Sequence, residues 1–246
     1  MYTSRMRVLK RSGSYENVSF DKILNRIKAL SIGPEFDTKL NIDETLVAQK
    51  VVQEIYDGVK TSELDELSAQ NSMSMYSTHS DFKTLAGRIA VSNLHKNTMV
   101  NFSDKIELMY KYDTKQPLIA KYLYELVMEN KEIIEGVIDY SRDYKYDFFG
   151  IKTLEKTYLY RVNKKIIERP QDMLMRVSLS IYRDNLDEAL KNYLFMSEHY
   201  FTHATPTLYN AGSGREQFAS CFLLTMNEDS IKGIYKTLGD CAQISK

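Results

Sequence analysis

Long hydrophobic runs are absent from this sequence, and cysteine is scarce. No stretch of about 18 apolar residues occurs, so no transmembrane helix is predicted. Residues 1–7 lack the apolar core of a signal peptide, so secretion is not expected. Only two cysteines occur in 246 residues. They provide no disulfide framework and favour a reducing, cytoplasmic location.

An excess of charge of either sign is also absent. The 33 Lys and Arg residues equal the 33 Asp and Glu residues in number. No overall field therefore attracts the chain to nucleic acid or to a membrane, and neither is expected as a partner. Any anion site must be local.

Several catalytic motifs are missing as well. The sequence has no Gly-x-Gly-x-x-Gly fingerprint, no Walker-type Gly-Lys-Ser/Thr loop and no His-Glu-x-x-His motif. Its four histidines lack the spacing typical of zinc ligands. No metal site made from the chain's own side chains is therefore expected.

Helical periodicity dominates what is present, and the predicted fold class is mainly α with short β-hairpins. One hairpin is expected around Ser12–Ser14 and a second around Asn163-Lys164. Apolar stripes at helical spacing predict helices in the segments that follow. These segments are 21–30, the stripe Val47, Val51, Ile55 and Val59 with a helix stop at Gly58, 61–79, 81–97, much of 99–147, a helix from Pro170 with the stripe Met173, Val177 and Ile181, and 186–200.

The chain changes character near its end. The near-continuous apolar run 218–224 predicts a strand buried on both faces, with Cys221 inside it. Asp229 is placed to cap a final helix that runs to Lys246. Cys241 shares a helical face with Ile234 and Leu238, which predicts core packing.

Two features leave alternatives open. The basic residues Arg5, Arg7, Lys10 and Arg11 precede the first acidic residue, Glu16, and form either a solvated surface or a phosphate site. Cys221 is either an inert core residue or one edge of an active site, since hydroxyl-rich residues precede it.

Three blocks resemble the large, catalytic subunit of class I ribonucleotide reductases of the eukaryotic and viral type. Val18–Lys22, Gly58–Asp65 and Arg88–Lys96 together resemble the ATP-cone regulatory domain. Glu168–Val177 and Thr205–Lys246 resemble the approach to the catalytic barrel. The resemblance implies an ATP-cone over 6–98, a helical domain over 99–200, and the first strand and helix of a ten-stranded α/β barrel over 201–246.

The resemblance also implies site residues. Contacts to ATP or dATP are expected from Lys10, Arg11, Glu16, Asn17, Val18, Ser19, Phe20, Asp21, Lys22, Thr61 and Asp65. From spacing alone, Thr61 to Asp65 would simply begin a helix. The implied site in the final segment has a redox-active thiol at Cys221, substrate contacts at Thr205 and Ser220, and specificity-effector contacts at Asp229, Ser230, Ile231 and Lys246. Cys241 matches no catalytic position.

The activity implied is the reduction of ribonucleoside diphosphates to deoxyribonucleotides. The effectors would be ATP, dATP and other deoxynucleoside triphosphates with magnesium. A separate metal-containing small subunit would generate the thiyl radical. Further implied partners are other large subunits, and thioredoxin or glutaredoxin acting through C-terminal cysteines.

The second redox cysteine and the radical-forming cysteine of the family are not found in this sequence, so the chain alone is expected to be inactive. Three hypotheses follow. The chain is the N-terminal part of a reductase whose C-terminal half is a separate partner, or a non-catalytic nucleotide-binding regulator of a complete reductase, or a structural fragment. The intact register of both nucleotide sites argues against the third.

Overall fold

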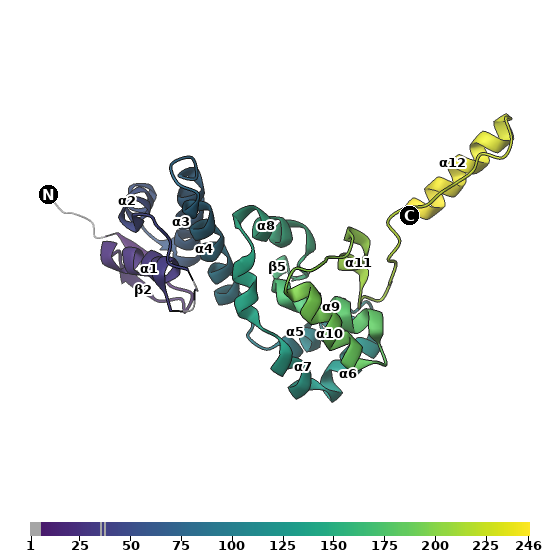
Figure 1. Cartoon of the computed structure of the whole chain (residues 1–246), viewed down its shortest axis with the longest axis horizontal. Coiled ribbons are helices and arrows are strands. Elements are labelled where there is room, and N and C mark those ends of the chain that lie inside the picture. Colours follow the sequence, from purple (N-terminus) through teal and green to yellow (C-terminus); the bar gives the residue numbers. More distant parts are fainter. Residues whose placement is uncertain (1–5, 35, 37) are drawn as a thin grey trace.

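The computed structural model describes residues 6–34, 36 and 38–246, which are mostly helical. The chain passes through a first unit of short strands and helices and then a second, helical unit. It ends in a helix that stands away from both (Figure 1). None of the described helices combines the length and hydrophobicity needed to cross a membrane.

The first unit contains a three-stranded sheet in the order β2-β1-β3. Strands β1 (Arg7–Leu9) and β2 (Tyr15–Asn17) pair antiparallel, which confirms the first predicted hairpin. Gly13, at φ +85°, provides the left-handed backbone of its turn. β3 (Val59–Lys60) pairs in parallel with β1.

The helical stripe predicted through Val59 is therefore wrong at its end. The helix stops at Glu54, and Gly58, at φ +84°, turns the chain so that Val59 enters the sheet. Val59 is fully buried there opposite Val8, so its apolar character serves a strand and not a helix.

Four helices complete the first unit. They are α1 (Phe20–Ile32), α2 (Glu44–Glu54), α3 (Thr61–Ser74) and α4 (Asp81–Asn97). The Ser19 hydroxyl caps α1 by accepting a hydrogen bond from the Lys22 amide. α4 has the predicted bounds, whereas α3 ends five residues before the predicted His79. Their apolar faces meet in a core that includes Ile27, Val47, Leu85 and Ile89.

The second unit is helical and is built around a buried central helix, α9 (Pro170–Tyr182). Pro170 occupies the first helical position, as predicted. Met173 and Val177 are buried, but Ile181 is 36% exposed, so the predicted stripe does not extend into the last turn. α9 packs against α10 (Leu186–Ser197), α11 (Thr205–Asn210) and the 3-10 helix η1 (Tyr140–Lys145). The other elements of this unit are α5 (Phe102–Lys111), α6 (Lys121–Glu129), α7 (Lys131–Val137), α8 (Phe148–Thr153), which also packs against α4, and the π-helix η2 (Leu154–Tyr158).

The second predicted hairpin is confirmed. β4 (Arg161–Val162) pairs antiparallel with β5 (Lys165–Ile166). The two residues between them, Asn163 at φ 49° and Lys164 at φ 65°, both adopt positive φ, as a tight two-residue hairpin turn requires.

The final segment differs most from its prediction. Residues 218–224 form no strand, and Leu223 is fully exposed. A strand needs a neighbour to pair its N–H and C=O groups, and the described sheets offer none to this run. The predicted buried barrel strand is therefore not formed.

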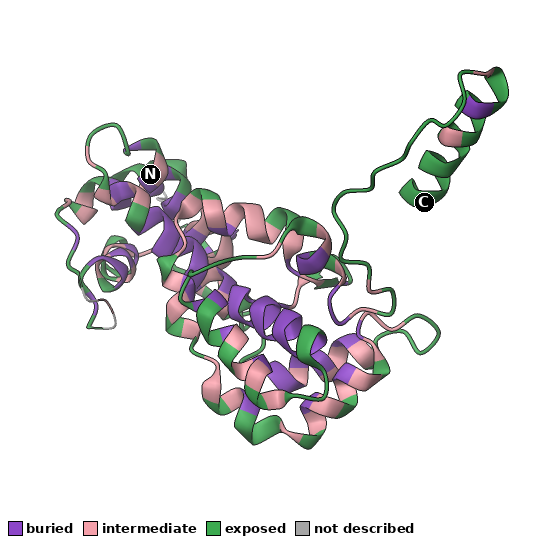
Figure 2. Cartoon of the chain, turned by 45° about the vertical axis from the view of Figure 1, so that its right-hand side comes forward, coloured by how far each residue is buried: buried purple, intermediate pink, exposed green. Residues whose placement is uncertain are grey.

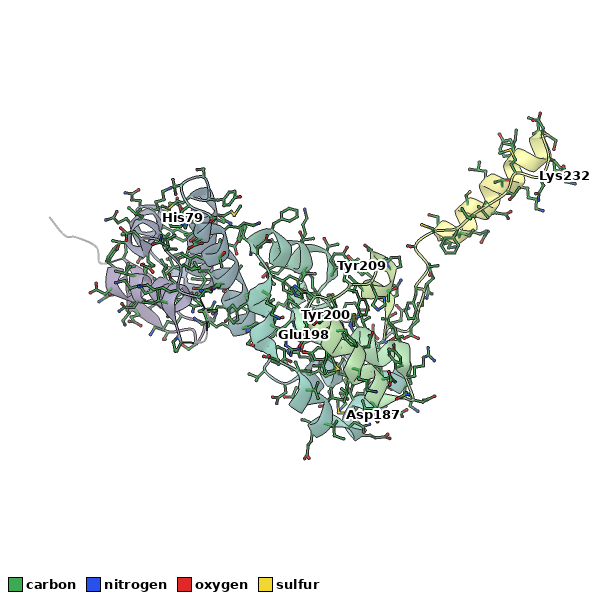
Figure 3. The ribbon with its side chains drawn as sticks, in the orientation of Figure 1. His79, Asp187, Glu198, Tyr200, Tyr209 and Lys232 are labelled. Atoms are coloured by element: carbon green, nitrogen blue, oxygen red, sulfur yellow. The ribbon has the colours of Figure 1, made fainter. Side chains whose placement is uncertain are left out.

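The last helix, α12 (Ile231–Ser245), is capped by Ser230 and not by Asp229. The Ser230 hydroxyl accepts a hydrogen bond from the Gly233 amide at 3.0 Å. The predicted core packing of Cys241 is also wrong, because Cys241 is exposed and Leu238 retains 60% exposure. Figure 2 shows α12 mostly exposed, and Figure 3 shows Lys232 on this helix, well separated from Tyr209 in the second unit.

Candidate functional site

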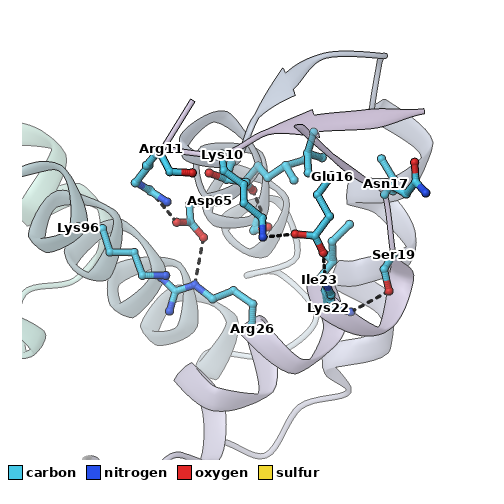
Figure 4. Close-up of a pocket in the computed structure, with 16 residues that line it drawn as sticks. Lys10, Arg11, Glu16, Asn17, Ser19, Lys22, Ile23, Arg26, Asp65 and Lys96 are labelled. Atoms are coloured by element: carbon cyan, nitrogen blue, oxygen red, sulfur yellow. Dashed lines mark hydrogen bonds and ion pairs between the residues drawn. The ribbon is translucent and has the colours of Figure 1, made fainter. Parts of the chain in front are cut away.

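A cavity of about 490 Å³ opens between the first hairpin and helices α1, α3 and α4 (Figure 4). Its wall combines basic, acidic, hydroxyl and apolar side chains drawn from four separate stretches of the chain. The lining residues are Val8, Lys10, Arg11, Ser12, Glu16, Asn17, Val18, Ser19, Lys22, Ile23, Arg26, Thr61, Leu64, Asp65, Ser68 and Lys96.

The structure places nine of the eleven predicted ATP or dATP residues on this wall. The two others, Phe20 and Asp21, begin α1 beside the cavity but do not line it. Both side chains are exposed, since the first turn of α1 directs them outward. Arg5, part of the predicted basic cluster, lies outside the described residues.

Asp65 organises one side of the cavity. Its carboxylate is nearly buried and accepts hydrogen bonds from Arg11 at 3.1 Å and from Arg26 at 3.2 Å. Arg26 also donates to the Ser92 hydroxyl at 2.7 Å. The sequence prediction missed Arg26, although it follows Lys22 by four residues and so lies on the same helical face.

Glu16 organises the opposite side. Its two carboxylate oxygens form ion pairs with the ammonium groups of Lys10 and Lys22 (Figure 4). These lysines sit on the hairpin and on α1 respectively, so Glu16 joins the sheet to the helix. Both ion pairs are partly exposed, so a more highly charged anion can displace the carboxylate.

The cavity carries more positive than negative charge. Five basic side chains, including Lys96 from α4, face two carboxylates. Desolvation lowers the pKa of Lys96, and the nearby Arg26 and Arg11 lower it further against the opposing effect of Asp65. Burial and the two guanidinium charges both disfavour the charged ammonium of Lys96, and an incoming anion would favour it.

The rest of the wall suits an uncharged, flat group. Val8, Val18, Ile23 and Leu64 supply apolar surface, and hydroxyls of Ser12 and Ser19 supply hydrogen bonds. The volume falls within the range of about 300–1,000 Å³ typical of small-molecule sites. The cavity can therefore hold a polyanion joined to a ring system, which is the composition of a nucleotide.

The residues predicted for substrate and redox roles, Thr205, Ser220 and Cys221, are exposed. The Thr205 hydroxyl, at the start of α11, lies 2.9 Å from the Tyr158 hydroxyl. Ser220 and Cys221 are exposed, 3.9 Å apart from Oγ to Sγ. Among the described residues Cys221 forms no disulfide.

The predicted specificity-effector residues lie at opposite ends of α12. Asp229, Ser230 and Ile231 are at its start and Lys246 follows its end. A helix of 15 residues is about 22 Å long, so Lys246 does not reach the same point as Asp229 within one chain. Within 6–34, 36 and 38–246, no group of three His, Cys, Asp or Glu side chains could hold a metal ion.

Two family models match the chain. Residues 6–97 match the ATP cone domain, and residues 144–216 match the ribonucleotide reductase all-alpha domain.

Curated relatives match nearly the whole chain. It is 52% identical over 251 residues to the ribonucleoside-diphosphate reductase large subunit of Dictyostelium discoideum, covering 99% of this chain and 28% of that relative. It is 50% identical to the large subunit of Arabidopsis thaliana, with 98% and 30% covered, and 48% identical to that of Vaccinia virus, with 98% and 32% covered. The chain thus spans about 30% of the length of the relatives it matches.

Proposed function

Because this chain belongs to the ribonucleotide reductase large-subunit family, we propose that it forms the N-terminal, regulatory part of a ribonucleoside-diphosphate reductase large subunit. Its first unit binds ATP or dATP, with associated magnesium, in the cavity between the hairpin and helices α1, α3 and α4. The bound nucleotide regulates the reduction of ribonucleoside diphosphates to deoxyribonucleotides. The domain boundaries proposed are 6–98, 99–200 and 201–246.

The observation that carries this proposal is the charge and shape of the cavity in the first unit. Basic groups of Lys10, Arg11, Lys22 and Lys96 converge on one space from the hairpin, α1 and α4. Cations that converge in this way bind a triphosphate through charge-assisted hydrogen bonds. The apolar wall formed by Ile23 and Leu64 accommodates the base.

The remaining proposed roles belong to the final segment. Cys221 would act as a redox thiol, Thr205 and Ser220 would contact substrate, and the ends of α12 would contact a specificity effector. The exposed apolar side chains of this segment, such as Leu223 and Leu238, support its packing against further protein. The partners proposed are the rest of a large subunit, a second large subunit, a metal-containing small subunit that supplies the radical, and thioredoxin or glutaredoxin.

The alternative of a non-catalytic regulator acting on a complete reductase is not favoured. A non-catalytic regulator would be expected to resemble the reductase mainly in the nucleotide-binding unit. The similarity instead extends over 98–99% of the chain, including the final segment.

Titration calorimetry of this chain with Mg–ATP and Mg–dATP tests the proposal. We expect a dissociation constant on the order of micromolar, equivalent to about −8 kcal/mol. Lys22→Ala removes a cation from the cavity and is expected to weaken binding on the order of tenfold. Lys28→Ala, on the same helix but away from the cavity, is the matched control and should bind like the unaltered chain. Absence of nucleotide binding would overturn the proposal.

A further inference from the structure

The last turn of α4 lies between the nucleotide cavity and the second unit, and it contacts both. On one face of residues 93–97, side chains form hydrogen bonds with the hairpin. On the other face, this turn forms hydrogen bonds with the start of α9 and with η1. The inference below concerns regulation by the cavity and therefore rests on the proposed function.

On the cavity side, the Arg11 guanidinium joins this turn to the hairpin. Arg11, in the turn between β1 and β2, donates from Nε to Oδ1 of Asn97 at 2.8 Å and from Nη2 to Oδ1 of Asn93. Asn97 in turn donates to the same Asn93 oxygen at 3.1 Å, and Asn93 donates to the Ser62 carbonyl at 3.2 Å. Arg11 thus joins the wall of the cavity to two successive turns of α4.

On the other side, the second unit holds the end of the same helix. Arg169, which precedes α9, donates from Nε to the Thr98 hydroxyl at 2.8 Å and from Nη2 to the His95 carbonyl at 3.0 Å. His95 Nε2 lies 2.7 Å from a carboxylate oxygen of Asp143, a fully buried residue of η1. Arg169 is itself almost fully buried, so these bonds are part of the packed interior of the second unit.

A second cavity, of about 460 Å³, lies against this junction. Asn93, Asn97 and Thr98 line it from the first unit, and Arg161 and Lys165 line it from the second hairpin. Because this space adjoins the two asparagines, their side chains have room to adopt other rotamers once Arg11 no longer holds them. The two asparagine side chains are therefore not close-packed on the side that faces the second hairpin.

We infer that Arg11 couples the nucleotide cavity to the second unit by exchanging its partners. In the structure the guanidinium binds two neutral amide oxygens and the Asp65 carboxylate. A triphosphate offers several charged oxygens, which an arginine binds more strongly and in bidentate fashion. When Arg11 turns to the phosphates, the last turn of α4 loses its hold on the hairpin, and its bonds to Arg169 and Asp143 readjust.

Hydrogen exchange of the whole chain, with and without Mg–ATP, tests this coupling. In the unaltered chain we expect ATP to change amide exchange by about threefold or more in two segments, 94–98 and 165–172. Inorganic tripolyphosphate, which has the charges but no nucleoside, should produce the same response. Asn97→Ala removes the bond from Nε of Arg11 at an exposed position and should leave binding intact while reducing the response in 165–172 by more than half.

The matched control is Asn25→Ala, an exposed asparagine of α1 that does not line either cavity. It should retain the full response. ATP binding without a response in 165–172, or a response that Asn97→Ala leaves unchanged, would overturn the inference alone. A double variant, Asn93→Ala/Asn97→Ala, should abolish the response, and persistence there would equally exclude Arg11 as the link. Failure to bind any nucleotide would overturn the proposed function together with the inference.

Discussion

The first unit and the final segment of this chain carry equally specific predictions of function, yet only the first unit forms a site. Around the nucleotide cavity, residues from the hairpin, α1, α3 and α4 face one another, and both carboxylates of the wall are paired with basic side chains. In residues 217–246 the predicted site residues are exposed, except for the half-buried Ser230, and they are spread along an extended run and a helix.

The two regions differ in the elements packed around their predicted site residues, and both contain the expected residue types. Asp65 meets Arg11 and Arg26 because a sheet and three helices share one core. The side chains of Cys221 and Ser220 contact each other, and both are exposed. A site of several groups therefore needs a packed scaffold around it, whereas the presence of the residue types is insufficient.

The largest expected effect comes from breaking the buried ion pair that holds α11, the last packed helix before the final segment. Arg176 and Glu168 form a fully buried pair, and Arg176 also donates to the carbonyls of Ala211 and, at 3.2 Å, Leu208. Arg176→Met keeps the bulk but leaves the Glu168 charge without its partner. We expect a loss of about 3–5 kcal/mol in the free energy of unfolding, measured by urea denaturation followed by circular dichroism.

Lys191→Met is the control for this prediction. It breaks the pair of Lys191 with Glu188, which is exposed on α10, and should leave the denaturation midpoint nearly unchanged. Equal effects of the two substitutions would show that the buried pair does not stabilise the end of the second unit.

Much of the scaffold could be predicted from sequence, because its signals are local. Both hairpins follow from turn residues between short β-like runs, and α4 follows from its periodicity. β3 could not be predicted, since Val59 continues the four-residue spacing of α2 and only the turn at Gly58 separates them.

The final segment was mispredicted for a different physical reason. An apolar run such as 218–224 shows that burial would be favourable, but it carries no information about which surface covers it. Similarly, Lys96 carries no local signal that distinguishes a cavity wall from a solvated helix face. Such residues are identified only once distant elements are packed together.

A smaller difference in the free energy of unfolding is expected when one apolar side chain is truncated in each region. Ile27 on α1 is 1% exposed in the core beneath the nucleotide cavity, and Leu223 is 100% exposed. Ile27→Ala should cost about 2–4 kcal/mol, because it leaves a cavity in a close-packed interior. Leu223→Ala should change stability by less than about 0.5 kcal/mol in the same urea assay. A cost for Leu223→Ala comparable to that of Ile27→Ala would mean that the final segment is packed, and the contrast would fail.

The smallest expected effect is on the boundary between the packed second unit and the exposed final segment. Glu216 is the last residue with several bonds to the second unit: it accepts from the Ser180 hydroxyl at 2.6 Å, the Gly212 amide at 2.9 Å and the Tyr122 hydroxyl. Burial raises the pKa of Glu216, but the hydrogen bonds from Ser180, Tyr122 and Gly212, with the charge of Arg183, outweigh it and lower the pKa below its usual value.

A depressed carboxylate pKa stabilises the folded chain above the pKa of the unfolded state, about 4.3, and this contribution is lost as pH falls through the folded pKa. Glu216→Gln should therefore destabilise the chain at pH 7, and its difference from the unaltered chain should shrink between about pH 5 and pH 3 in urea titrations. Glu129→Gln, an exposed carboxylate on α6, should show no such pH dependence. If the two substitutions behave alike, the hydrogen bonds to Glu216 do not stabilise the boundary, and the packed unit ends earlier in the chain.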